Sequence, residues 1–393
     1  MISYVDELAV KDKRVFIRAD FNVPLSPEGT ITDDNRIKST LPTITSVLDR
    51  GGSVILASHL GRPKGKVDKQ YTLASVAARL AELLEREVIF PEDCVGKDVE
   101  EKAHGLQPGE VLLLENLRFH PEEEKNDQGF AQRLAGLADI YINDAFAVCH
   151  RAHASVEAIT RFCKAKGAGF LVKNEITYFS KALENPERPV VAIVGGAKVS
   201  GKLEVLENLL QKVDTILIGG GMAFTFLKAR GVDVGKSLVE MDLLDTARTI
   251  LGKAENSGVT VILPVDCVVA EKIDGTAEYK TTTVDAIPVD WMGLDIGAQT
   301  LALFKEALKD ARTIVWNGPM GVFELEPFST GTYGTIALVA DSPALSIVGG
   351  GDTDVALHRS GKAECISFIS TAGGAFLELL KGSTLPGIKA LDH

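Results

Sequence analysis

The chain has 393 residues, a length that is too great for one ordinary hydrophobic core and that predicts two domains. Its 45% hydrophobic and 24% charged residues are typical of a globular protein, and no apolar run approaches the roughly 20 residues that span a bilayer. The net charge of −12 argues against nucleic acid and anionic membranes as partners, because both carry negative charge. An anionic substrate would therefore need positive charge gathered in one place.

The N-terminus and the cysteines are those expected of a cytoplasmic protein. The first residues contain early acids and lack a basic start followed by an apolar stretch, so we expect no secretory signal. The five cysteines are scattered and form no C-x-x-C pair, which argues against a disulfide framework or a structural zinc site.

Short β-branched runs recur along the chain and are separated by stretches with helical spacing. Most runs are apolar throughout, which is typical of strands buried on both faces of a parallel sheet. In chain order the predicted strands are Val15–Ala19, Ser53–Ala57, Val111–Leu114, Ile140–Ile142, Pro189–Val194, Thr215–Ile218, Val259–Leu263, Arg312–Trp316, Leu345–Val348 and Ile366–Ile369. Predicted helices between them include Leu73–Glu85 and Leu203–Lys212. The alternation predicts the α/β class, with two doubly wound, Rossmann-like parallel-sheet domains.

The strand series is interrupted near residues 171–188. Leu171–Leu183 has the pattern of a polar-faced helix, and Pro186 and Pro189 end it before the strands resume. We therefore predict an N-terminal domain at 1–170, an interdomain helix and hinge at 171–188, a C-terminal domain at 189–380 and a tail at 381–393. Ligands of open α/β sheets bind beyond the carboxyl ends of the strands, so we expect a cleft between the two domains.

The loops of the first half concentrate positive charge. Arginines and histidines stand at or just beyond predicted strand ends; they are Arg18, Arg36, His59, Arg62, Arg118, Arg151 and His153. Planar guanidinium groups bind carboxylate and phosphate oxygens in pairs, so the set fits a substrate that carries both groups. A solvated surface role would explain any one of them, but it does not explain their joint placement. Asp20 and Asn22 either close a turn or bind a substrate hydroxyl.

The loops of the second half are rich in glycine instead. Gly196–Leu203 follows a strand and opens a helix as a P-loop does, but Leu203 stands where a P-loop needs a hydroxyl for Mg²⁺. We therefore reject a standard P-loop and expect the backbone N–H groups at this turn to favour an anion. Lys198 and Lys202 are four residues apart and share a face, which an anion between them would stabilise.

Two further glycine turns follow predicted strands. Gly349–Thr353 brings its backbone close to any bound phosphate, and Asp352 within it can hold Mg²⁺. Ile369–Ala375 offers a third turn that leads into a helix at Phe376–Lys381. Packing alone is a poor explanation for three such turns in one domain.

Taken in order, the motifs resemble those of the phosphoglycerate kinase family along essentially the whole chain. The motifs that carry the resemblance are Arg18-Ala19-Asp20-Phe21-Asn22-Val23-Pro24, Ser58-His59-Leu60-Gly61-Arg62-Pro63, Glu115-Asn116-Leu117-Arg118-Phe119, His150-Arg151-Ala152-His153-Ala154-Ser155, Gly195-Gly196-Ala197-Lys198-Val199-Ser200, Gly219-Gly220-Gly221-Met222-Ala223-Phe224-Thr225-Phe226, Trp316-Asn317-Gly318-Pro319-Met320-Gly321-Val322-Phe323-Glu324 and Gly349-Gly350-Gly351-Asp352-Thr353.

The resemblance implies that the N-terminal domain binds 3-phosphoglycerate. The implied substrate residues are Asp20, Phe21, Asn22, Arg36, His59, Leu60, Gly61, Arg62, Arg118 and Arg151, with His153 as a weaker candidate. Asp20 and Asn22 would hold the hydroxyl and carboxyl end, while His59 and the arginines beyond it would hold the phosphate.

The resemblance also implies that the C-terminal domain binds ATP or ADP with Mg²⁺ as cofactor. The implied nucleotide residues are Lys202, Gly219, Gly220, Gly293, Glu324, Gly350, Gly351, Asp352 and Thr353. The adenine would lie against Gly219, Gly220 and Gly293. Glu324 would bind the ribose, and Asp352 would bind the metal.

The implied reaction is the reversible, direct in-line transfer of a phosphoryl group between 1,3-bisphosphoglycerate and ADP, giving 3-phosphoglycerate and ATP, with closure of a hinge. Arg36, Lys198, Gly373 and Gly374 would stabilise the group in flight. The partners would be these small molecules, with neither nucleic acid nor membrane, and the protein would be a cytoplasmic, glycolytic monomer.

The chain departs from the family pattern at Gly201, at Ala147-Val148-Cys149 and at Ala372, none of which is a residue with an implied direct role. Two other functions fit the sequence less well. A dinucleotide-dependent dehydrogenase lacks support because no G-x-G-x-x-G follows an early strand. A non-catalytic nucleotide binder would have no use for Arg36 and Lys198.

Overall fold

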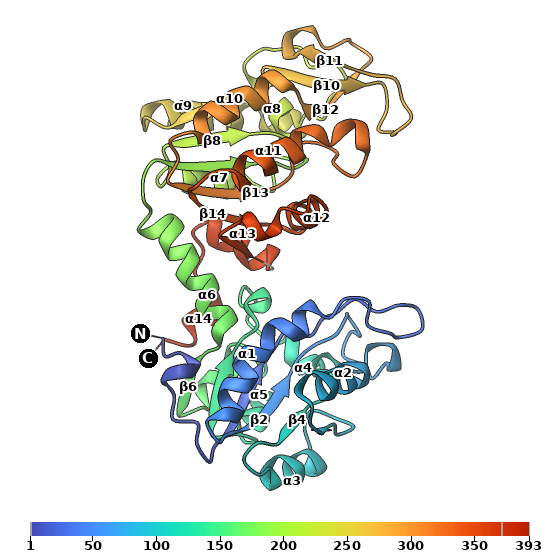
Figure 1. The fold of residues 1–393 in the computed structure, drawn as a ribbon, viewed down its shortest axis with the longest axis vertical. Helices are drawn as coiled ribbons and strands as arrows, with labels where there is room; N and C mark the ends of the chain where they lie inside the picture. The colour runs from blue at the N-terminus through green and yellow to red at the C-terminus, as the bar shows by residue number, and fades with distance from the viewer. Residues whose placement is uncertain (1, 371, 393) are drawn as a thin grey trace. The chain divides into compact units, whose positions relative to one another are not determined.

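The computed structural model describes residues 2–370 and 372–392, and the chain divides into two compact units. The first unit comprises Met1–Ile176 with Thr384–His393, and the second comprises Thr177–Ser383. Each unit is built on a six-stranded parallel sheet with helices packed on it (Figure 1), which confirms the predicted α/β class. Among the described residues, no helix is both long and apolar enough to cross a bilayer.

The sheet of the first unit has the order β3-β4-β2-β1-β5-β6, and all of its strand pairs are parallel. Its strands are β1 (Arg14–Arg18), β2 (Ser53–Ala57), β3 (Val88–Ile89), β4 (Val111–Leu113), β5 (Ile140–Asn143) and β6 (Ala165–Ala168). Because β2, β1 and β5 are neighbours, the loops that follow them emerge side by side at one edge of the sheet.

Helices of the first unit include α1 (Asn35–Asp49), α2 (Ala74–Leu84), α3 (Lys97–Gly105), α4 (Pro121–Glu124), α5 (Gln128–Ala135) and α6 (Phe170–Phe179). Apolar residues of α1 and α2 pack against alternate residues of the strands in one buried cluster, which includes Ile37, Ile44, Leu80, Ile17 and Leu56. This burial drives the strand-helix layering, since continuous apolar strands need cover on both faces.

The sheet of the second unit has the order β15-β14-β13-β7-β8-β9 and is also parallel. Its strands are β7 (Val190–Val194), β8 (Thr215–Ile218), β9 (Thr260–Ile262), β13 (Thr313–Asn317), β14 (Leu345–Gly349) and β15 (Phe368–Ser370). The chain runs outward from β7 in one direction and from β13 in the other. The boundary between β7 and β13 is therefore the point where such sheets bind ligands.

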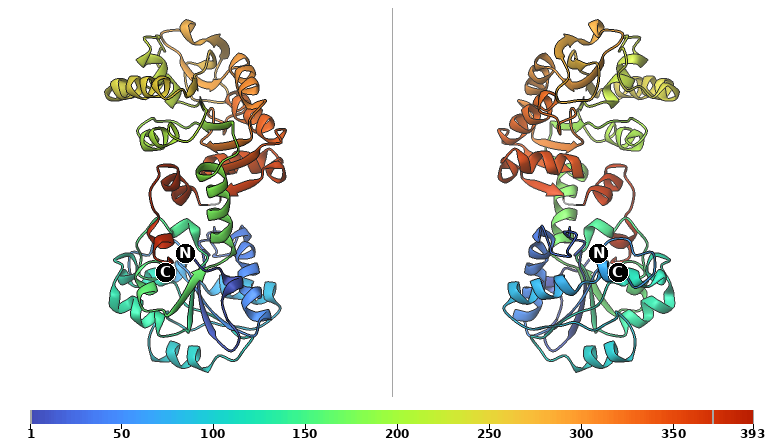
Figure 2. Two further views of the ribbon diagram at one scale, coloured as in Figure 1. Left: turned by 90° about the vertical axis from the view of Figure 1, so that its left-hand side faces the viewer. Right: turned by 90° about the vertical axis from the view of Figure 1, so that its right-hand side faces the viewer.

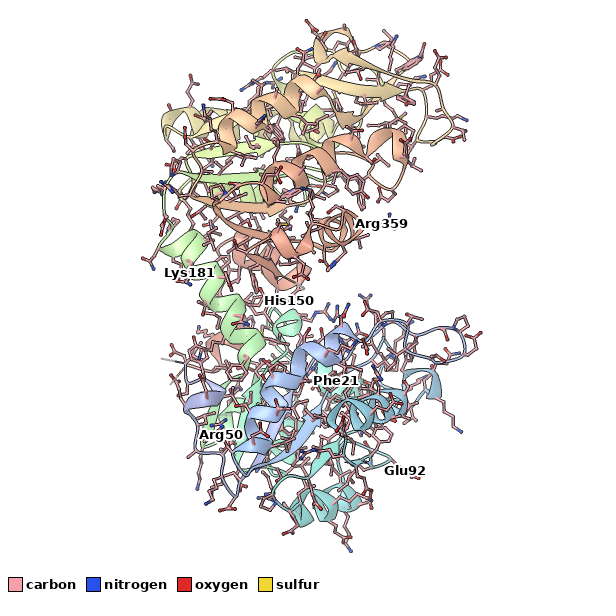
Figure 3. The ribbon with its side chains drawn as sticks, in the orientation of Figure 1. Phe21, Arg50, Glu92, His150, Lys181 and Arg359 are labelled. Carbon is pink, nitrogen blue, oxygen red and sulfur yellow. The ribbon has the colours of Figure 1, made fainter. Side chains whose placement is uncertain are left out.

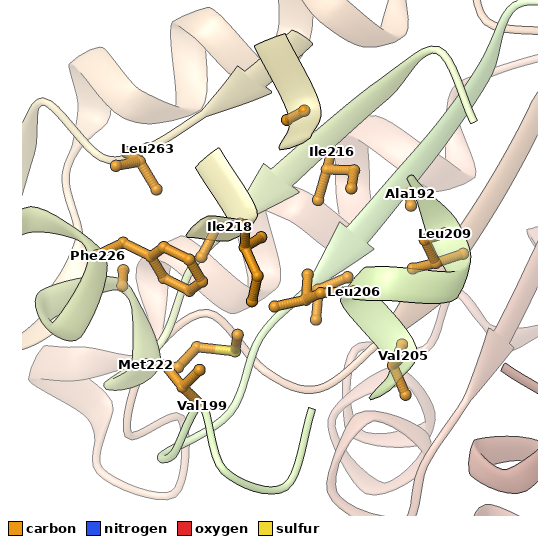
Figure 4. Close-up of a cluster of buried hydrophobic side chains, with 14 of the residues drawn as sticks. Ala192, Val199, Val205, Leu206, Leu209, Ile216, Ile218, Met222, Phe226 and Leu263 are labelled. Atoms are coloured by element: carbon orange, nitrogen blue, oxygen red, sulfur yellow. The ribbon is translucent and has the colours of Figure 1, made fainter. Parts of the chain in front are cut away.

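Helices of the second unit are α7 (Leu203–Leu209), α8 (Met222–Ala229), α9 (Leu244–Asn256), α10 (Ala298–Leu308), α11 (Thr330–Ala340), α12 (Gly351–Arg359) and α13 (Gly373–Leu380). Figure 4 shows part of the core, in which Leu206 of α7 and Phe226 of α8 lie in one cluster with Ile216 and Ile218 of β8. α7 begins at Leu203, so the residues 196–202 before it form an open loop that follows β7.

A three-stranded antiparallel sheet, β11-β10-β12, accompanies the two parallel sheets and was not predicted. It consists of β10 (Asp266–Ala270), β11 (Tyr279–Thr283) and β12 (Met292–Ile296). β11 is largely exposed and polar, and β12 contains a glycine and an aspartate, so neither has the apolar run of a buried strand. The sequence also missed β3 and β6, which are short or rich in small residues.

The ends of the first unit are fixed by hydrogen bonds. Asp144, just after β5, accepts hydrogen bonds at Oδ1 from the amides of Leu171 at 2.8 Å and Val172 at 3.4 Å, and so caps the start of α6. The C-terminal segment with α14 (Pro386–Lys389), visible from two sides in Figure 2, packs on the first unit. There the Gly387 amide donates to the Cys149 carbonyl at 2.9 Å.

Candidate active site

A group of positively charged and imidazole side chains meets beyond the strand ends of the first unit; this group, called the basic cradle here, consists of Arg18, His59, Arg118, Arg151 and His153. Arg118, Arg151 and Arg18 all act electrostatically on both histidines, which places the five side chains close together. Arg18 is fully buried, and His59, Arg118 and His153 are nearly so. The structure thus gathers charge that the sequence separates by more than 130 residues.

The two histidines of the cradle are neutral at neutral pH. Burial, followed by Arg18 and Arg118, holds the pKa of His59 well below its ordinary value. The same causes lower the pKa of His153 to about 3. Arg18 Nη2 donates to His59 Nδ1 at 3.3 Å, so the neutral ring of His59 carries its proton on Nε2. That N–H is a donor that an anion can accept.

Some of the N–H donors of Arg118 have no acceptor among the described residues. Its Nη1 donates to the Gly61 carbonyl at 2.8 Å, which fixes the guanidinium in place. Its Nε and Nη2 are buried and have no hydrogen-bond partner within the described part of the chain, although Nε lies 3.4 Å from a Glu124 oxygen. Buried cationic donors without acceptors are costly, and a bound phosphate or carboxylate would satisfy them.

A chain of buried hydrogen bonds holds Arg18 of the cradle in place, and sequence reasoning missed it. Arg18 Nε donates to Ser155 Oγ at 2.8 Å, and Ser155 Oγ donates in turn to Glu123 Oε1 at 2.6 Å. Glu123 is fully buried, and burial raises its pKa against the opposing effect of Arg18. Glu123 stands in a run of three glutamates, which on sequence alone is typical of a solvated helix start.

The loop after β1, which carries Phe21 (labelled in Figure 3), is joined to the cradle through Gly61, which bonds both Asn22 and Arg118. Arg36, on α1, forms an ion pair with Asp20, and Asn22 Oδ1 accepts a hydrogen bond from the Gly61 amide at 2.8 Å. The side chains of Phe21 and Leu60 are buried in the apolar core of this unit. Of the predicted substrate residues, these two contribute packing through their side chains.

The remaining predicted residues of the first unit are more open. Arg62 is exposed, while Arg36 and Arg151 are half-buried. Arg151 Nε donates to His150 Nε2 at 3.1 Å. Exposed guanidinium groups around buried ones give a site that is fixed at its base and adaptable at its rim.

A pocket of about 280 Å³ opens in the second unit where the loops after β7 and β13 meet; it is called the glycine pocket here. The predicted residues that line it are Gly220, Gly293, Glu324 and Asp352. Gly196 and Pro319 line it too and are joined by a hydrogen bond from the Gly196 amide to the Pro319 carbonyl at 3.0 Å. The pocket therefore lies at the topological switch point of this sheet.

Glycine is required at the pocket wall because the backbone is tightly packed behind it. A methyl group at Gly293 would lie 1.9 Å from Cζ of Phe224. Gly219 does not line the pocket but packs behind it, where a methyl group would lie 2.4 Å from the Met320 sulfur.

Apolar side chains complete the glycine pocket, and sequence reasoning missed them; they are Leu238, Ile273, Met292, Leu294 and Val322. Leu238 and Ile273 are 45% and 60% exposed, which is unusual for large apolar groups unless a ligand covers them. A flat aromatic ring fits such walls. Single apolar residues in loops follow no periodicity, so no sequence signal marks them.

Lys202 and Asp352 place opposite charges near one another, Asp352 at the pocket wall and Lys202 just before α7. Burial lowers the pKa of Lys202 to about 8, and Asp352 partly opposes that shift. Lys198 is exposed on the loop before α7. Asp352 lines the pocket from the first turn of α12, where helix N–H groups favour an anion.

The other glycine turns lie next to Asp352. Thr353 is fully buried, and its Oγ1 accepts a hydrogen bond from the Gly318 amide at 2.9 Å, so it joins the loops after β13 and β14. A methyl group at Gly373 would lie 3.3 Å from the Gly351 nitrogen, which places the first turn of α13 beside that of α12. Within the predicted turn Ile369–Ala375, Thr371 lies outside the described residues.

The donor set at the pocket fits Mg²⁺ bound together with phosphate. Mg²⁺ takes one or two carboxylates and fills its other positions with phosphate oxygens and water, and Asp352 supplies one carboxylate. In the part of the chain that the structure describes, the cluster of three potential ligands is Asp93, Cys94 and His120, which belongs to the first unit.

Two anionic substrates need separate sites, and each unit of this chain provides one of a different kind. The first offers fixed cationic donors, and the second offers helix N-termini, an acid for a metal and apolar walls. The class that fits this division is a two-substrate phosphotransferase.

Comparison with known proteins agrees with that class. The sequence model of the phosphoglycerate kinase family matches residues 5–383. The phosphoglycerate kinase of Geobacter metallireducens is 60% identical over 393 residues, covering all of this chain and 99% of the relative. That of Geotalea uraniireducens is 59% identical over 392 residues, covering all of this chain and 98% of the relative.

Solved structures agree as well. The phosphoglycerate kinase of Coxiella burnetii superposes with a TM-score of 0.93 at 44% identity, covering all of this chain and 99% of the other. That of Pyrococcus horikoshii gives a TM-score of 0.82 at 35% identity, with 98% and 97% coverage. The chain belongs to the phosphoglycerate kinase family.

Proposed function

We propose that the first unit of this chain binds 3-phosphoglycerate at the basic cradle, and that the second unit binds ADP or ATP at the glycine pocket. The reaction is that of the family, the reversible transfer of a phosphoryl group between 1,3-bisphosphoglycerate and ADP that gives 3-phosphoglycerate and ATP. It belongs to the glycolytic set of reactions.

The observation that carries the assignment of the substrate is the state of Arg118. Two of its nitrogens are buried without a hydrogen-bond partner among the described residues, within a cradle that also contains Arg18 and Arg151. The chain as a whole carries a net charge of −12, so the positive charge of the cradle is opposite in sign to that of the protein. The phosphate of 3-phosphoglycerate would accept from Arg118, Arg151, Arg62 and the His59 Nε2–H.

The acceptor needs positioning rather than activation. The carboxylate of 3-phosphoglycerate is already a nucleophile, so no general base is required. Asp20 and Asn22 would orient the hydroxyl and carboxyl end, while Arg36 stands at the same loop through its ion pair with Asp20. Phosphoryl transfer depends on charge neutralisation around three equatorial oxygens. Arg36, Lys198 and the N–H groups of Gly373 and Gly374 would supply it.

The nucleotide would lie in the glycine pocket with its base between apolar walls and its phosphates at the start of α12. Lys202 would bind a phosphate, Asp352 would hold Mg²⁺, and Glu324 would bind the ribose. The metal neutralises phosphate charge when it is bound. Gly350, Gly351 and Thr353 would keep the backbone close to the phosphates.

Direct in-line transfer requires the two ligands to meet with water excluded, so we infer that the working enzyme closes about a hinge near residues 171–188. We further infer that it works as a monomer in the cytoplasm, with small molecules rather than nucleic acid or membrane as partners. The net charge of −12 supports this choice of partners.

The test is an assay of the purified chain with ATP, Mg²⁺ and 3-phosphoglycerate, in which formation of 1,3-bisphosphoglycerate is followed through a coupled dehydrogenase. Turnover that needs all three components supports the proposal. ATP binding without turnover would instead indicate a non-catalytic nucleotide binder. Oxidation of NADH in the absence of the coupling enzyme would indicate a dehydrogenase.

A further inference from the structure

We propose that Asp295 is a positioning residue of the glycine pocket: its carboxylate joins the strand, the loop and the helix start that hold the pocket's walls in register. The inference rests on the proposed nucleotide site in the second unit. Asp295 does not line the pocket and is 3% exposed, so it would act through its neighbours rather than on the ligand.

Asp295 lies directly behind two residues of the pocket wall. Gly293 and Leu294 precede it on β12 and line the pocket. Gly321 and Val322, on the loop after β13, also line the pocket. The Val322 amide donates to the Leu294 carbonyl at 2.9 Å, so strand and loop are adjacent at this point.

Both oxygens of Asp295 accept hydrogen bonds from backbone amides. Oδ2 accepts from Gly331 at 2.6 Å, and Oδ1 accepts from Ile296 at 2.9 Å. Gly331 is the second residue of α11, whose first N–H groups have no acceptor within the helix. The N-cap residue Ser329 makes no capping bond with its side chain. Asp295 caps α11 instead, although it belongs to strand β12.

The backbone is shaped to meet the carboxylate at two glycines. A methyl group at Gly321 would lie 2.2 Å from Asp295 Oδ1, and one at Gly331 would lie 2.3 Å from the same oxygen. The loop that carries Gly321 and the first turn of α11 therefore both pass against this one side chain. A displacement of Asp295 would be transmitted to both.

Burial of the Asp295 carboxylate costs free energy. Burial raises its pKa to about 7, although the Gly331 and Ile296 amides oppose the shift. An apolar side chain would fill the same volume without burying a charge. The directional bonds of a carboxylate explain its presence better than packing does.

Asp266 provides a matched control in the same antiparallel sheet. It is 2% exposed, and its carboxylate caps α10 by accepting from the Gln299 amide at 2.9 Å and the Thr300 amide at 2.8 Å. Neither Asp266 nor any residue of α10 lines the glycine pocket. The two aspartates are therefore both buried and both accept from the start of a helix, but only Asp295 lies behind the pocket wall.

The experiment compares ADP binding by calorimetry for the full-length wild type, Asp295→Asn and Asp266→Asn. The amide side chain is isosteric with the carboxylate but can accept at only one of the two positions. Loss of one of the two hydrogen bonds from backbone amides should weaken ADP binding about tenfold in Asp295→Asn, with Asp266→Asn within about twofold of wild type. The KM for ATP should rise in parallel, while kcat stays within about threefold.

A second variant reaches the same contact from the other side. Gly331→Ala places a methyl group against Asp295 Oδ1 without touching the pocket, and it should weaken ADP binding in the same way. 3-Phosphoglycerate affinity, measured on every variant, reports on the first unit and should not change.

Unchanged ADP affinity in both Asp295→Asn and Gly331→Ala would overturn the inference and leave the proposed function standing. Equal losses in Asp266→Asn and Asp295→Asn would also overturn it, because the effect would then belong to helix capping in general. A wild type that binds no ADP would instead overturn the proposed function.

Discussion

The guanidinium of Arg36 and the carboxylate of Asp20 form an ion pair, with Arg36 on α1 and Asp20 just after β1. Asp20 is 11% exposed at its side chain, whereas Arg36 is 40% exposed. The acid therefore holds the arginine at the loop while leaving part of the guanidinium open to a ligand. This arrangement fits a residue that acts on the transferred group.

Arg36→Ala should lower kcat by at least about a hundredfold, because it removes positive charge from the equatorial oxygens in the transition state. The KM for ATP should change less than about threefold, since Arg36 belongs to the unit that binds the acceptor. Steady-state kinetics with both substrates varied provide the measurement. Lys38→Ala is the control, because Lys38 lies on the same helix and pairs with Asp34 at 2.8 Å. If kcat of Arg36→Ala stays within about threefold of wild type, under about 1 kcal/mol, the assignment is wrong.

Asp352→Ala should abolish the effect of Mg²⁺ on nucleotide binding, because Asp352 is the pocket carboxylate at the start of α12, where the phosphates and the metal would lie. ADP titrations with and without Mg²⁺ measure this effect. Asp354→Ala removes a neighbouring acid that pairs with His358 at 3.1 Å and should keep the normal dependence on Mg²⁺. A variant that still binds Mg-ADP better than free ADP, by the wild-type margin, contradicts the metal assignment.

Lys202 predicts a pH dependence of nucleotide affinity. Its pKa is lowered to about 8 by burial, so the ammonium is charged below that pH and loses its proton above it. ADP binding by the wild type should therefore weaken as the pH rises through about 8, by at most about tenfold per pH unit. Lys202→Arg keeps its charge throughout this range and should show a flatter profile. If the two proteins show equal slopes between pH 7 and about 10, the assignment of Lys202 to nucleotide binding is wrong.

Asp144, which caps α6, predicts a pH dependence of stability. Burial raises its pKa to about 7, above the ordinary value of 3.8, so the folded chain binds this proton more readily than the unfolded chain does. The free energy of unfolding of the wild type should thus fall, relative to Asp144→Asn, as the pH rises from about 4 to 7, by up to about 4 kcal/mol. Urea unfolding followed by circular dichroism measures the difference.

Asp139 is the control for Asp144, because hydrogen bonding to Arg14 lowers the pKa of Asp139. The stability that Asp139 contributes is present above its unfolded pKa and is lost as the pH falls through its folded pKa. The wild type should therefore differ from Asp139→Asn with the opposite sign of slope and in a more acidic range. A difference between wild type and Asp144→Asn that is constant from pH 4 to about 7 would show that Asp144 does not titrate as stated.

The parallel sheets were predictable because most of their strands carry a continuous apolar run, as β7 does along its whole length and β2 does from Val54 to Ala57. β11 could not be predicted, since an exposed, threonine-rich strand has the composition of a loop. β12 was missed for a related reason. Its Gly293, which lines the pocket, and its buried Asp295 break the apolar pattern.

The gathering of polar residues at strand ends could be predicted because parallel topology brings such loops together, and their role as ligand contacts stays a prediction. Glu123, Ser155 and Asp295 could not, because a buried acid or hydroxyl acquires its function from partners that are distant in sequence. Leu238 and Ile273 could not be predicted from the sequence either. A lone apolar residue in a loop gives no sequence signal until a pocket is seen beside it.

The central claim is that the phosphoryl group passes directly from the nucleotide to the substrate carboxylate, without a covalent enzyme intermediate. Turnover of 3-phosphoglycerate with ATP made chiral at the γ-phosphorus by oxygen isotopes, followed by analysis of the product's configuration, tests it most directly. A single in-line displacement predicts inversion at phosphorus. Retention of configuration would contradict the claim, because it requires an even number of displacements and therefore a phosphorylated form of the protein.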